Sequence, residues 1–357
     1  MNVIDAIRER LTEIRPVGAR GDIVALGMVH AVDARAGAVT IQLAPGQLPQ
    51  GVVQATIADI RRAIGALDGV TSVDVRIEAP PQQTQSPYGE LGPIPGVRDI
   101  IAVSSTKGGV GKSTVAVNLA LALQQRGRSV GLLDSDVYGP SAPLMLGIDG
   151  RPHIGDDKRM VPIERFGLRV MSLGFFLDDT SPVIWRGPMV MGLVRQFLKD
   201  VEWGVLDVLV VDMPPGTGDA QLTLVQQVPL AGGVVVTTPQ DVALLDVERG
   251  IAMFQQVNTP VLGVIENMSF YECPKCGTKD DIFGSGGGER IAQHFGVPLL
   301  GRIPLIPAIR ESGDSGKPIV IAEPSSTAAK IFLDIAGAVI DEVEAGRAET
   351  TAPKIVG

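Results

Sequence analysis

Residues 106–113 read TKGGVGKS, and their types and spacing are those of a loop that binds phosphate. The pattern G-x-x-x-x-G-K-[ST] holds at Gly111, Lys112 and Ser113, while Thr106 occupies its first glycine position. Glycines let a backbone wrap a polyphosphate so that its N–H groups point at the phosphate oxygens. Lys112 is expected to reach the β- and γ-phosphates, and the Ser113 hydroxyl is expected to bind Mg²⁺. The sequence therefore predicts a site for a nucleoside triphosphate.

The segments on either side of this loop support the same interpretation. Apolar residues at 100–103 predict a strand that leads into it, and residues 115–123 carry the apolar pattern of a helix that follows it. Bound phosphates would therefore meet a helix N-terminus, which favours anions. The alternative, a glycine-rich turn without a ligand, does not require a strand, a Lys-Ser pair and a helix in series. The residues that we expect at the nucleotide are Thr106, Lys107, Gly108, Gly109, Val110, Gly111, Lys112, Ser113 and Thr114.

Two further apolar runs end in acids. Ligands gather at the carboxyl ends of parallel strands, so a nucleotide site in a doubly wound sheet needs its acids there. Asp134 and Asp136 follow residues 130–133, and Asp212 closes the run LDVLVVD. Asp212 fits the acid that holds Mg²⁺ through its water shell, and we expect Asp134 and Ser113 beside the same ion. An Asp at a strand end is also often a turn former or a helix cap, and that alternative stays open.

Apolar runs and helical patterns alternate along residues 98–345. This order predicts an α/β domain with a doubly wound, mostly parallel sheet that helices cover on both faces. The expected strands lie at residues 100–105, 129–134, 206–212, 232–238, 261–266 and 299–303.

Residues 1–78 predict a separate, small α+β domain in the order α-β-β-α-β. Its helices are expected at 3–14 and 57–67, and its strands at 22–30, 39–43 and 73–77. The domain has no cysteine and a single histidine, so it shows no catalytic constellation. Contact with a partner and a purely structural role both stay open. The Pro- and Gln-rich residues 79–97 predict an extended linker, and residues 346–357 predict a disordered tail.

Composition excludes several classes of protein. The chain has 357 residues and a net charge of −9, which disfavours non-specific binding to nucleic acid. No apolar run approaches the roughly 20 residues that span a bilayer. The charged N-terminal segment MNVIDAIRERLTEIR is no signal peptide. We therefore expect a cytoplasmic protein without nucleic-acid or membrane partners.

The two cysteines of the chain, Cys273 and Cys276, lie three positions apart in a Gly- and Asp-rich loop. Two such thiolates can chelate one metal, and Lys275 would help to keep them deprotonated. A four-iron cluster needs four thiolates, and zinc commonly needs four ligands. A symmetric dimer could close one such site on its two-fold axis. A shared [4Fe–4S] cluster, a shared zinc ion and a redox dithiol remain the three alternatives.

A lysine directly before the double glycine of TKGGVGKS resembles the deviant phosphate loop of the dimeric ATPases. That group includes Min-type and Par-type proteins and the nitrogenase iron protein. The resemblance implies a sandwich dimer in which Lys107 crosses to the partner's nucleotide and acts in catalysis together with Lys112. It also implies that Asp136 orients the attacking water and that Asn267, in the string IENMS, contacts adenine. The chain has no N-K-x-D string to read guanine.

A narrower resemblance is to the Mrp/ApbC family of iron–sulfur cluster carriers. It rests on SSTKGGVGKST, LLDSDVYGPS, IWRGPM, VVDMPPGTGD, ENMSFYECPKCG and GRIP, and residues 1–78 also resemble the assembly-linked domain of many bacterial members. The resemblance implies a homodimer that binds ATP and Mg²⁺ and hydrolyses ATP slowly. It also implies a labile [4Fe–4S] cluster, held by Cys273 and Cys276 of both chains, that passes between scaffold proteins and apo-proteins. Thr106 departs from the glycine that is common there, and the role of Trp185, Arg186 and Gly187 is open.

Functions from other classes remain as alternatives. An ATP-switched spatial regulator of the Min or Par type, with a structural zinc site, would need an amphipathic basic tail or a basic surface. The C-terminal AETTAPKIVG is neither, and such a regulator leaves the cysteine pair unexplained. A reductase that passes electrons through its cluster is the third possibility.

Overall fold

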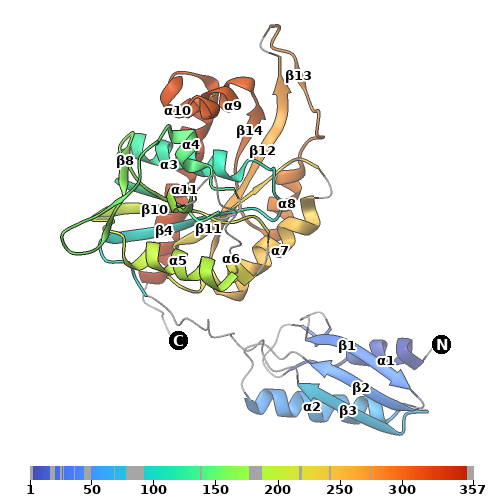
Figure 1. Cartoon of the computed structure of the whole chain (residues 1–357). Helices are drawn as coiled ribbons and strands as arrows, with labels where there is room; N and C mark the ends of the chain where they lie inside the picture. The colour runs from blue at the N-terminus through green and yellow to red at the C-terminus, as the bar shows by residue number, and fades with distance from the viewer. Residues whose placement is uncertain are drawn as a thin grey trace. The chain divides into compact units, whose positions relative to one another are not determined.

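A computed structural model describes most of the chain, in two compact units, Met1–Tyr88 and Gly89–Gly357 (Figure 1). Most of the predicted linker at 79–97 lies outside the described part, as do Trp185 and Arg186 of the string IWRGPM. The described residues are 3–16, 21–24, 26, 28–35, 37–43, 50–67, 69–77, 92–136, 139–176, 187–216, 219–240, 243–273 and 275–351.

The smaller unit is a three-stranded sheet with two helices. Its elements are α1 (Val3–Leu11), β1 (Val29–Arg35), β2 (Ala38–Leu43), α2 (Gln50–Gly65) and β3 (Ser72–Ile77). β2 lies in the middle, antiparallel to β1 and parallel to β3. Because side chains alternate along a strand, Val39, Ile41 and Leu43 point to one face, where they are buried in one core with Ile7 and Ile60.

The strand predicted at residues 22–30 is wrong, because β1 begins only at Val29. The Asp22 carboxylate accepts a hydrogen bond from Val24 N at 3.0 Å, and Met28 N donates to Ile23 O at 2.9 Å. A short polar side chain that bonds the backbone two residues on favours a turn over an extended strand.

The larger unit is built on a nine-stranded sheet in the order β13-β12-β11-β4-β10-β5-β9-β8, with β14 also paired to β12. All neighbouring strands are parallel except β8 and β13, which are antiparallel to their neighbours. The predicted α/β fold with a mostly parallel sheet is confirmed. The strands are β4 (Val97–Ser104), β5 (Val130–Asp134), β8 (Ile163–Arg165), β9 (Leu168–Ser172), β10 (Leu206–Asp212), β11 (Gly232–Thr237), β12 (Val261–Glu272), β13 (Lys279–Asp280) and β14 (Leu299–Leu305), beside a separate pair β6 (His153–Ile154) and β7 (Met160–Val161).

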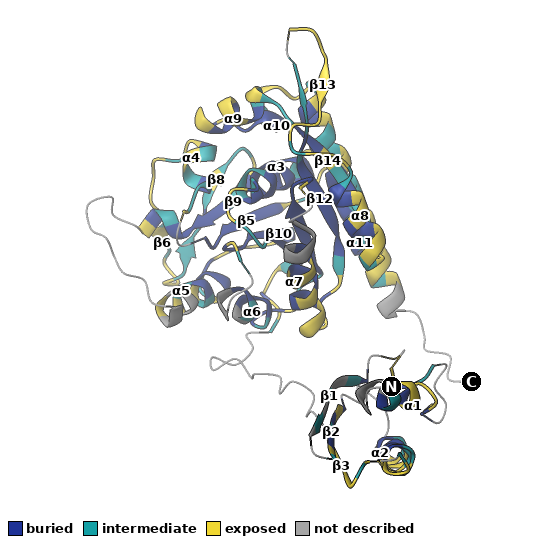
Figure 2. Ribbon diagram, turned by 90° about the vertical axis from the view of Figure 1, so that its right-hand side faces the viewer, coloured by how far each residue is buried: buried dark blue, intermediate teal, exposed yellow. Residues whose placement is uncertain are grey.

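Helices cover both faces of this sheet (Figure 1). The central strands are consequently buried along their length, as the dark blue ribbons of Figure 2 show. No helix in the described part of the chain is long and apolar enough to cross a lipid bilayer. The helices are α3 (Lys112–Gln125), α4 (Ala142–Leu146), the 3₁₀ turn η1 (Leu173–Phe176), α5 (Gly187–Lys199), α6 (Asp219–Val225), α7 (Ala243–Gln256), α8 (Gly287–Phe295), α9 (Pro307–Asp314), α10 (Ile319–Ala322) and α11 (Thr327–Thr351).

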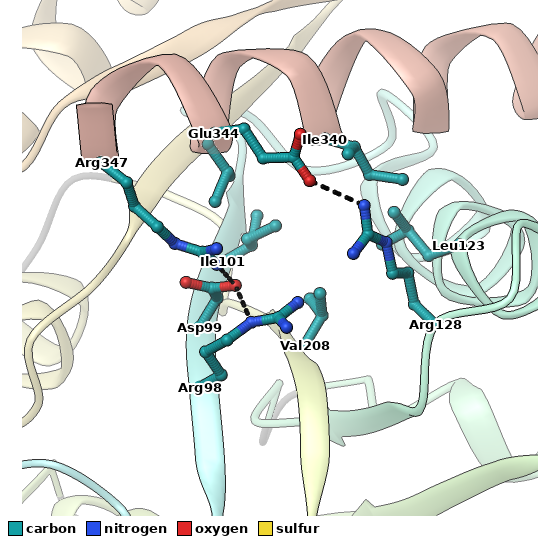
Figure 3. A pocket seen from close by; sticks show the side chains of 10 residues that line it. Arg98, Asp99, Ile101, Leu123, Arg128, Val208, Ile340, Glu344 and Arg347 are labelled. Atoms are coloured by element: carbon teal, nitrogen blue, oxygen red, sulfur yellow. Dashed lines mark hydrogen bonds and ion pairs between the residues drawn. The ribbon is translucent and has the colours of Figure 1, made fainter. Parts of the chain in front are cut away.

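The long helix α11 corrects the predicted disorder of the C-terminal residues. It continues to Thr351, so residues 346–351 are helical, and residues 352–357 lie outside the described part. The reason is tertiary contact: Arg347 of this last stretch pairs with the buried carboxylate of Asp99 at the start of β4 (Figure 3).

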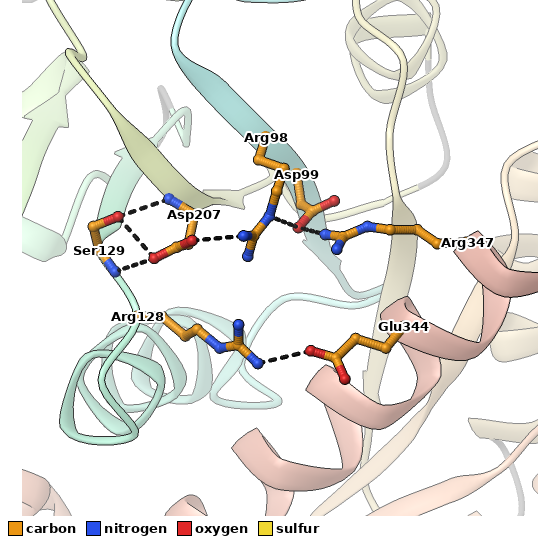
Figure 4. A network of polar contacts seen from close by, with 7 residues as sticks. All are labelled: Arg98, Asp99, Arg128, Ser129, Asp207, Glu344 and Arg347. Atoms are coloured by element: carbon orange, nitrogen blue, oxygen red, sulfur yellow. Dashed lines mark hydrogen bonds and ion pairs between the residues drawn. The ribbon is translucent and has the colours of Figure 1, made fainter.

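This ion pair belongs to a network of charged groups around the start of β4 (Figure 4). Asp99 also accepts a hydrogen bond from Arg98 Nε at 3.3 Å, and Glu344 of α11 accepts one from Arg128 at 2.7 Å. The small recess in Figure 3 is lined by these groups. Because it lies at the amino end of β4, it is separate from the phosphate loop, which leaves the carboxyl end.

We predict that Arg347→Ala lowers the free energy of unfolding by about 1–3 kcal/mol, because it leaves Asp99 buried with fewer donors. Arg310→Ala is the matched control, since Arg310 forms an exposed pair with Asp314 and its loss should cost less than about 0.5 kcal/mol. Chemical denaturation followed by tryptophan fluorescence reports on the larger unit, which holds both tryptophans. Equal effects of the two substitutions would contradict the account.

Candidate functional site

The predicted phosphate loop connects the end of β4 to the start of α3. Gly109 and Gly111 have φ of 80° and 79°, in the left-handed region that glycine enters without strain. Gly111 is also the N-cap of α3, where no side chain bonds the first amides of the helix. These amides are therefore open to an anion, as a phosphate site requires.

Four of the predicted site residues come together around the Lys112 ammonium. Lys112 is buried, and its Nζ forms an ion pair with Asp212 Oδ1 at the end of β10. The same Nζ lies 3.2 Å from Ser113 Oγ and 3.8 Å from Asp136 Oδ2. The structure thus brings to one point the predicted phosphate-binding lysine, the hydroxyl and the acid predicted for Mg²⁺, and the acid predicted to orient the attacking water.

Unpaired buried oxygens mark the same edge of the sheet. Among the described residues, the buried side-chain atoms without a hydrogen-bond partner are Ser104 Oγ, Asp212 Oδ2 and Gln221 Oε1. Ser104 and Asp212 end neighbouring strands, and Gln221 lies in α6, which follows β10. Burial raises the pKa of the Asp212 carboxyl, and the Lys112 ammonium opposes this rise. Since Mg²⁺ and its waters bind oxygen ligands, Asp212 and Ser113 fit the magnesium role.

Asp134 differs from Asp212 because both its oxygens already have partners. Its Oδ1 accepts a hydrogen bond from Asp136 N at 3.2 Å, and its Oδ2 accepts from Ala142 N at 3.1 Å and Ser172 Oγ at 3.0 Å. Burial raises the pKa of Asp134 to about 7, and the Asp212 carboxylate adds to the rise. Its magnesium role stays a prediction, and these contacts favour the turn and cap alternative.

The unusual threonine of the loop is accommodated by a glycine on α7. A Cβ built on Gly250 would lie 3.0 Å from Thr106 Cγ2, so the absence of a side chain there leaves room for the threonine methyl. Lys107 follows it, and its carbonyl accepts a hydrogen bond from Ser105 Oγ at 2.9 Å. The predicted crossing of Lys107 to a second chain stays a prediction.

Asn267 lies against the phosphate loop. Its Nδ2 donates to Val110 O at 2.8 Å, and a Cβ at Gly111 would overlap this amide nitrogen. Glycine is therefore required at Gly111 for two reasons, its positive φ and the approach of Asn267. The predicted contact between Asn267 and adenine stays a prediction.

Met268, the next residue, has φ of 55°, a left-handed conformation that is strained for a methionine. It lies in a bulge of β12, since Asn267 faces Ile303 of β14 whereas Tyr271 faces Leu305. Four steps along β12 thus correspond to two along β14. Strain of this kind costs on the order of 1–3 kcal/mol and is found at functional sites.

Glu266 is a site residue that our sequence reasoning missed. Its carboxylate is fully buried and accepts hydrogen bonds of 2.5 Å from Gly288 N of α8 and from Ser269 Oγ. It thereby fixes β12 to the start of α8. An acid inside the apolar run VLGVIE was the available signal, because buried carboxylates need partners.

The cysteines lie at the tip of a β-hairpin rather than in an irregular loop. β12 continues to Glu272 and pairs with β13 through Tyr271–Asp280 and Glu272–Lys279. The hairpin projects from the body of the larger unit (Figure 1). In its turn, Gly277 N donates to Cys273 O at 2.8 Å. Cys273 is half-buried and Cys276 is exposed, so the pair is accessible from outside.

The turn favours the thiolate form of Cys276. A hydrogen bond from the Thr278 hydroxyl is the first cause that lowers the pKa of this thiol, and the Thr278 backbone and Cys273 add to it. The Sγ–Oγ1 distance is 3.2 Å. The main stabilising group for this thiolate is thus the Thr278 hydroxyl, and the help expected from Lys275 stays a prediction.

One chain offers an incomplete metal site. Within the described residues, no group of three or more His, Cys, Asp or Glu side chains is placed to hold a metal ion. The cysteine pair can therefore supply two ligands, and a four-ligand site needs a second source.

We predict that Thr278→Val shifts the pH profile of Cys276 alkylation to higher pH, because the thiolate loses its hydroxyl donor and is protonated sooner as the pH falls. Thr278→Ser keeps the hydroxyl and should restore the wild-type profile. Trypsin cleaves after Lys275 and separates the two thiols for mass spectrometry. An unchanged profile in Thr278→Val would show that another group sets the pKa.

Comparison with known proteins agrees with these features. The family described as NUBPL iron-transfer P-loop NTPase matches residues 96–340, and that described as iron-sulfur cluster assembly protein matches residues 4–75. The chain is 47% identical to an iron-sulfur cluster carrier protein of Synechocystis over 93% of this chain and 96% of the relative. A relative of the same description from Aquifex aeolicus is 45% identical over 96% of this chain and 98% of its own length.

Solved structures match about two thirds of the chain. A nucleotide-binding protein from Archaeoglobus fulgidus in complex with ADP is 38% identical, with a TM-score of 0.59 over 66% of this chain and 93% of that chain. The septum site-determining protein MinD of Pyrococcus horikoshii, complexed with Mg-ADP, is 23% identical with a TM-score of 0.55 over 70% of this chain and 98% of that chain, and shares the fold. The phosphate loop and cysteine hairpin of this chain, its match to the family model and its identity to the Synechocystis relative place it in the family of NUBPL-type iron-transfer P-loop NTPases.

Proposed function

We propose that this protein carries an iron–sulfur cluster between two copies of its chain, binds and slowly hydrolyses ATP, and passes the cluster to apo-proteins. The observation that carries the proposal is the exposed Cys273–Cys276 turn on a protein with a phosphate loop. The descriptions of the relatives from Synechocystis and Aquifex aeolicus, both iron-sulfur cluster carrier proteins, support it.

In this proposal the cluster is transported and released rather than kept, and the cysteine turn has properties that allow release. Two thiolates per chain and four iron atoms per cluster match when two chains contribute equally. A cluster held at an exposed hairpin tip is open to an acceptor's thiolates. The lowered pKa of Cys276 keeps a ligand ready for metal.

The nucleotide would rearrange the charges around Lys112. In the structure this ammonium is paired with Asp212. We infer that an incoming triphosphate draws Lys112 to its β- and γ-oxygens and so releases Asp212 to hold Mg²⁺ together with Ser113. Bound there, the ion neutralises phosphate charge. Asp136, 3.8 Å from Lys112 Nζ, is the acid that we assign to orienting the attacking water.

A second chain would complete the site. Lys107 is half-buried and directly precedes the exposed Gly108 and Gly109, from where its side chain would extend to a partner's nucleotide. A positive charge supplied in trans stabilises the phosphates in the transition state, as an arginine finger does. ATP would thus favour a homodimer in which both cysteine pairs belong to one assembly.

The small unit is proposed to dock a scaffold protein or an apo-protein. Its match to the iron-sulfur cluster assembly family supports this role, and no enzyme chemistry is assigned to it. The boundaries 1–78, 79–97 and 98–345 and a cytoplasmic location without nucleic-acid or membrane partners remain predictions of the sequence.

We predict that Lys112→Ala lowers ATP hydrolysis by about a hundredfold and abolishes ATP-dependent transfer from the reconstituted protein to an apo four-iron enzyme. Its iron content should stay that of the wild type, because the cysteines are untouched. Lys330→Ala, on the exposed side of α11, is the matched control and should behave as the wild type.

The double variant Cys273→Ala/Cys276→Ala should lose iron and transfer together while it keeps ATP hydrolysis. Transfer by Lys112→Ala at the wild-type rate would refute the role of ATP. Iron retained without the cysteines would refute the proposed cluster site.

A further inference from the structure

We propose that Asn267 is a positioning residue that links the phosphate loop to the cysteine pair. Its hydrogen bond to Val110 O, and the bulge that follows it in β12, would make the conformation of the Cys273–Cys276 turn depend on the bound nucleotide. This inference rests on the proposed function and adds the residue through which its two sites communicate.

The covalent connection is short. Asn267 lies within β12, and Cys273 directly follows the last residue of the same strand. Cys273 lies six positions after Asn267, which is at most about 20 Å of extended chain. No other element intervenes, so a displacement of Asn267 along or about the strand reaches the turn directly.

The connection is tight at the phosphate loop. Asn267 is buried, and its amide donates to Val110 O at 2.8 Å. The amide nitrogen also occupies the space that a Cβ at Gly111 would take. Phosphates that reorient Val110 and Gly111 must therefore move the Asn267 side chain or break its hydrogen bond.

The strand is anchored on the inner side of Asn267. Glu266 accepts the hydrogen bond from Gly288 N, and Arg302 Nε lies 3.8 Å from its Oε1. A Cβ at Gly288 would come within 2.8 Å of Glu266 Cβ, so α8 and β12 are in close contact there. With this side fixed, a displacement at Asn267 is taken up by the residues that follow it.

Those residues form the bulge. Met268 is left-handed, with φ of 55°, and two additional residues of β12 separate the pairs Asn267–Ile303 and Tyr271–Leu305. Within the bulge, Ser269 Oγ donates a hydrogen bond of 2.5 Å to Glu266 Oε1. A bulge raises the local twist of a strand, so a change in its geometry turns the strand beyond it.

Beyond the bulge the strand has short connections. Tyr271 pairs with Leu305 of β14 and with Asp280 of β13, Glu272 pairs with Lys279, and Lys279 Nζ lies 4.6 Å from the centre of the Phe270 ring. The thiols at the tip are therefore oriented by the segment that the bulge controls. Coupling between two binding sites is reciprocal. If the nucleotide changes the affinity of the cysteines for metal by some factor, metal at the cysteines changes the affinity for the nucleotide by that same factor.

The test is the alkylation rate of the cluster-free protein with and without a saturating non-hydrolysable ATP analogue and Mg²⁺. The chain has two cysteines, so every labelled thiol reports on this turn. We expect the analogue to change the wild-type rate about fivefold or more. In Asn267→Ala the rate should be the same with and without the analogue.

Asn118→Ala is the matched control. Asn118 is also buried and donates to a backbone carbonyl, Thr114 O at 2.9 Å, but it lies on α3 and not on β12. It should keep the wild-type response. Analogue titration verifies saturation for each variant. If Asn267→Ala cannot be saturated with the analogue, the Met268→Gly variant tests the inference instead. Glycine adopts the left-handed conformation without strain and is more flexible there, so the effect of the analogue on the alkylation rate should weaken although Asn267 is still present.

A nucleotide response retained in Asn267→Ala, or in Met268→Gly where that variant decides, would overturn the inference, as would the absence of a response in the wild type. Occlusion of the thiols by a partner chain would give such a retained response. Iron binding is measured separately on reconstituted wild type. Absence of iron would count against the proposed function, whereas alkylation of the cluster-free protein would still decide the inference.

Discussion

The ion pair between Lys112 and Asp212 is the contact on which the site depends. It joins the residue that begins α3 to the residue that ends β10, and both side chains are almost completely buried. A buried charge without a partner is costly, so each of these groups requires the other until a ligand replaces it. The parallel pairing of β4 and β10 makes this possible, because it places Asp212 opposite Val103, just before the phosphate loop. The buried ion pair therefore depends on the order of the strands in the sheet.

A second constraint follows from the position of β12. This strand lies between β11 and β14 in the sheet, and it extends beyond β11 toward the cysteines. Asn267 contacts the phosphate loop from the part of the strand inside the sheet. The residue that contacts the phosphate loop lies on the strand that leads to the cysteines, and Glu266 fixes that strand to α8. We regard this shared strand as the structural basis of the proposed carrier.

The sequence predicted best what depends on burial alone. The strand expected at 206–212 matches β10, because a strand covered on both faces has a continuous apolar run with clear ends. It predicted less well where distant residues decide. β12 was expected to end at residue 266, but pairing with β13 and β14 extends it to Glu272 through polar residues. The helical residues 346–351 depend on Asp99, which lies 248 positions from Arg347.

The candidate site shows the same division. The loop motif and the cysteine spacing are local, so the residues of both could be named from the sequence. The contact of Asn267 with Val110 and the left-handed conformation of Met268 arise from tertiary packing, so the local sequence does not predict them. At Asp134 the motif leaves open whether the carboxylate binds metal or caps a turn, and the bonds that it accepts from Asp136 N and Ala142 N could not be deduced from the sequence.

The central claim is that one cluster is shared by the cysteine pairs of two chains. Native mass spectrometry of the anaerobically reconstituted protein measures this stoichiometry directly. The account predicts a dimer whose added mass is that of a single [4Fe–4S] cluster, alongside cluster-free monomers. A monomer that holds its own cluster would contradict the shared site, and a dimer that holds only zinc would contradict the carrier function.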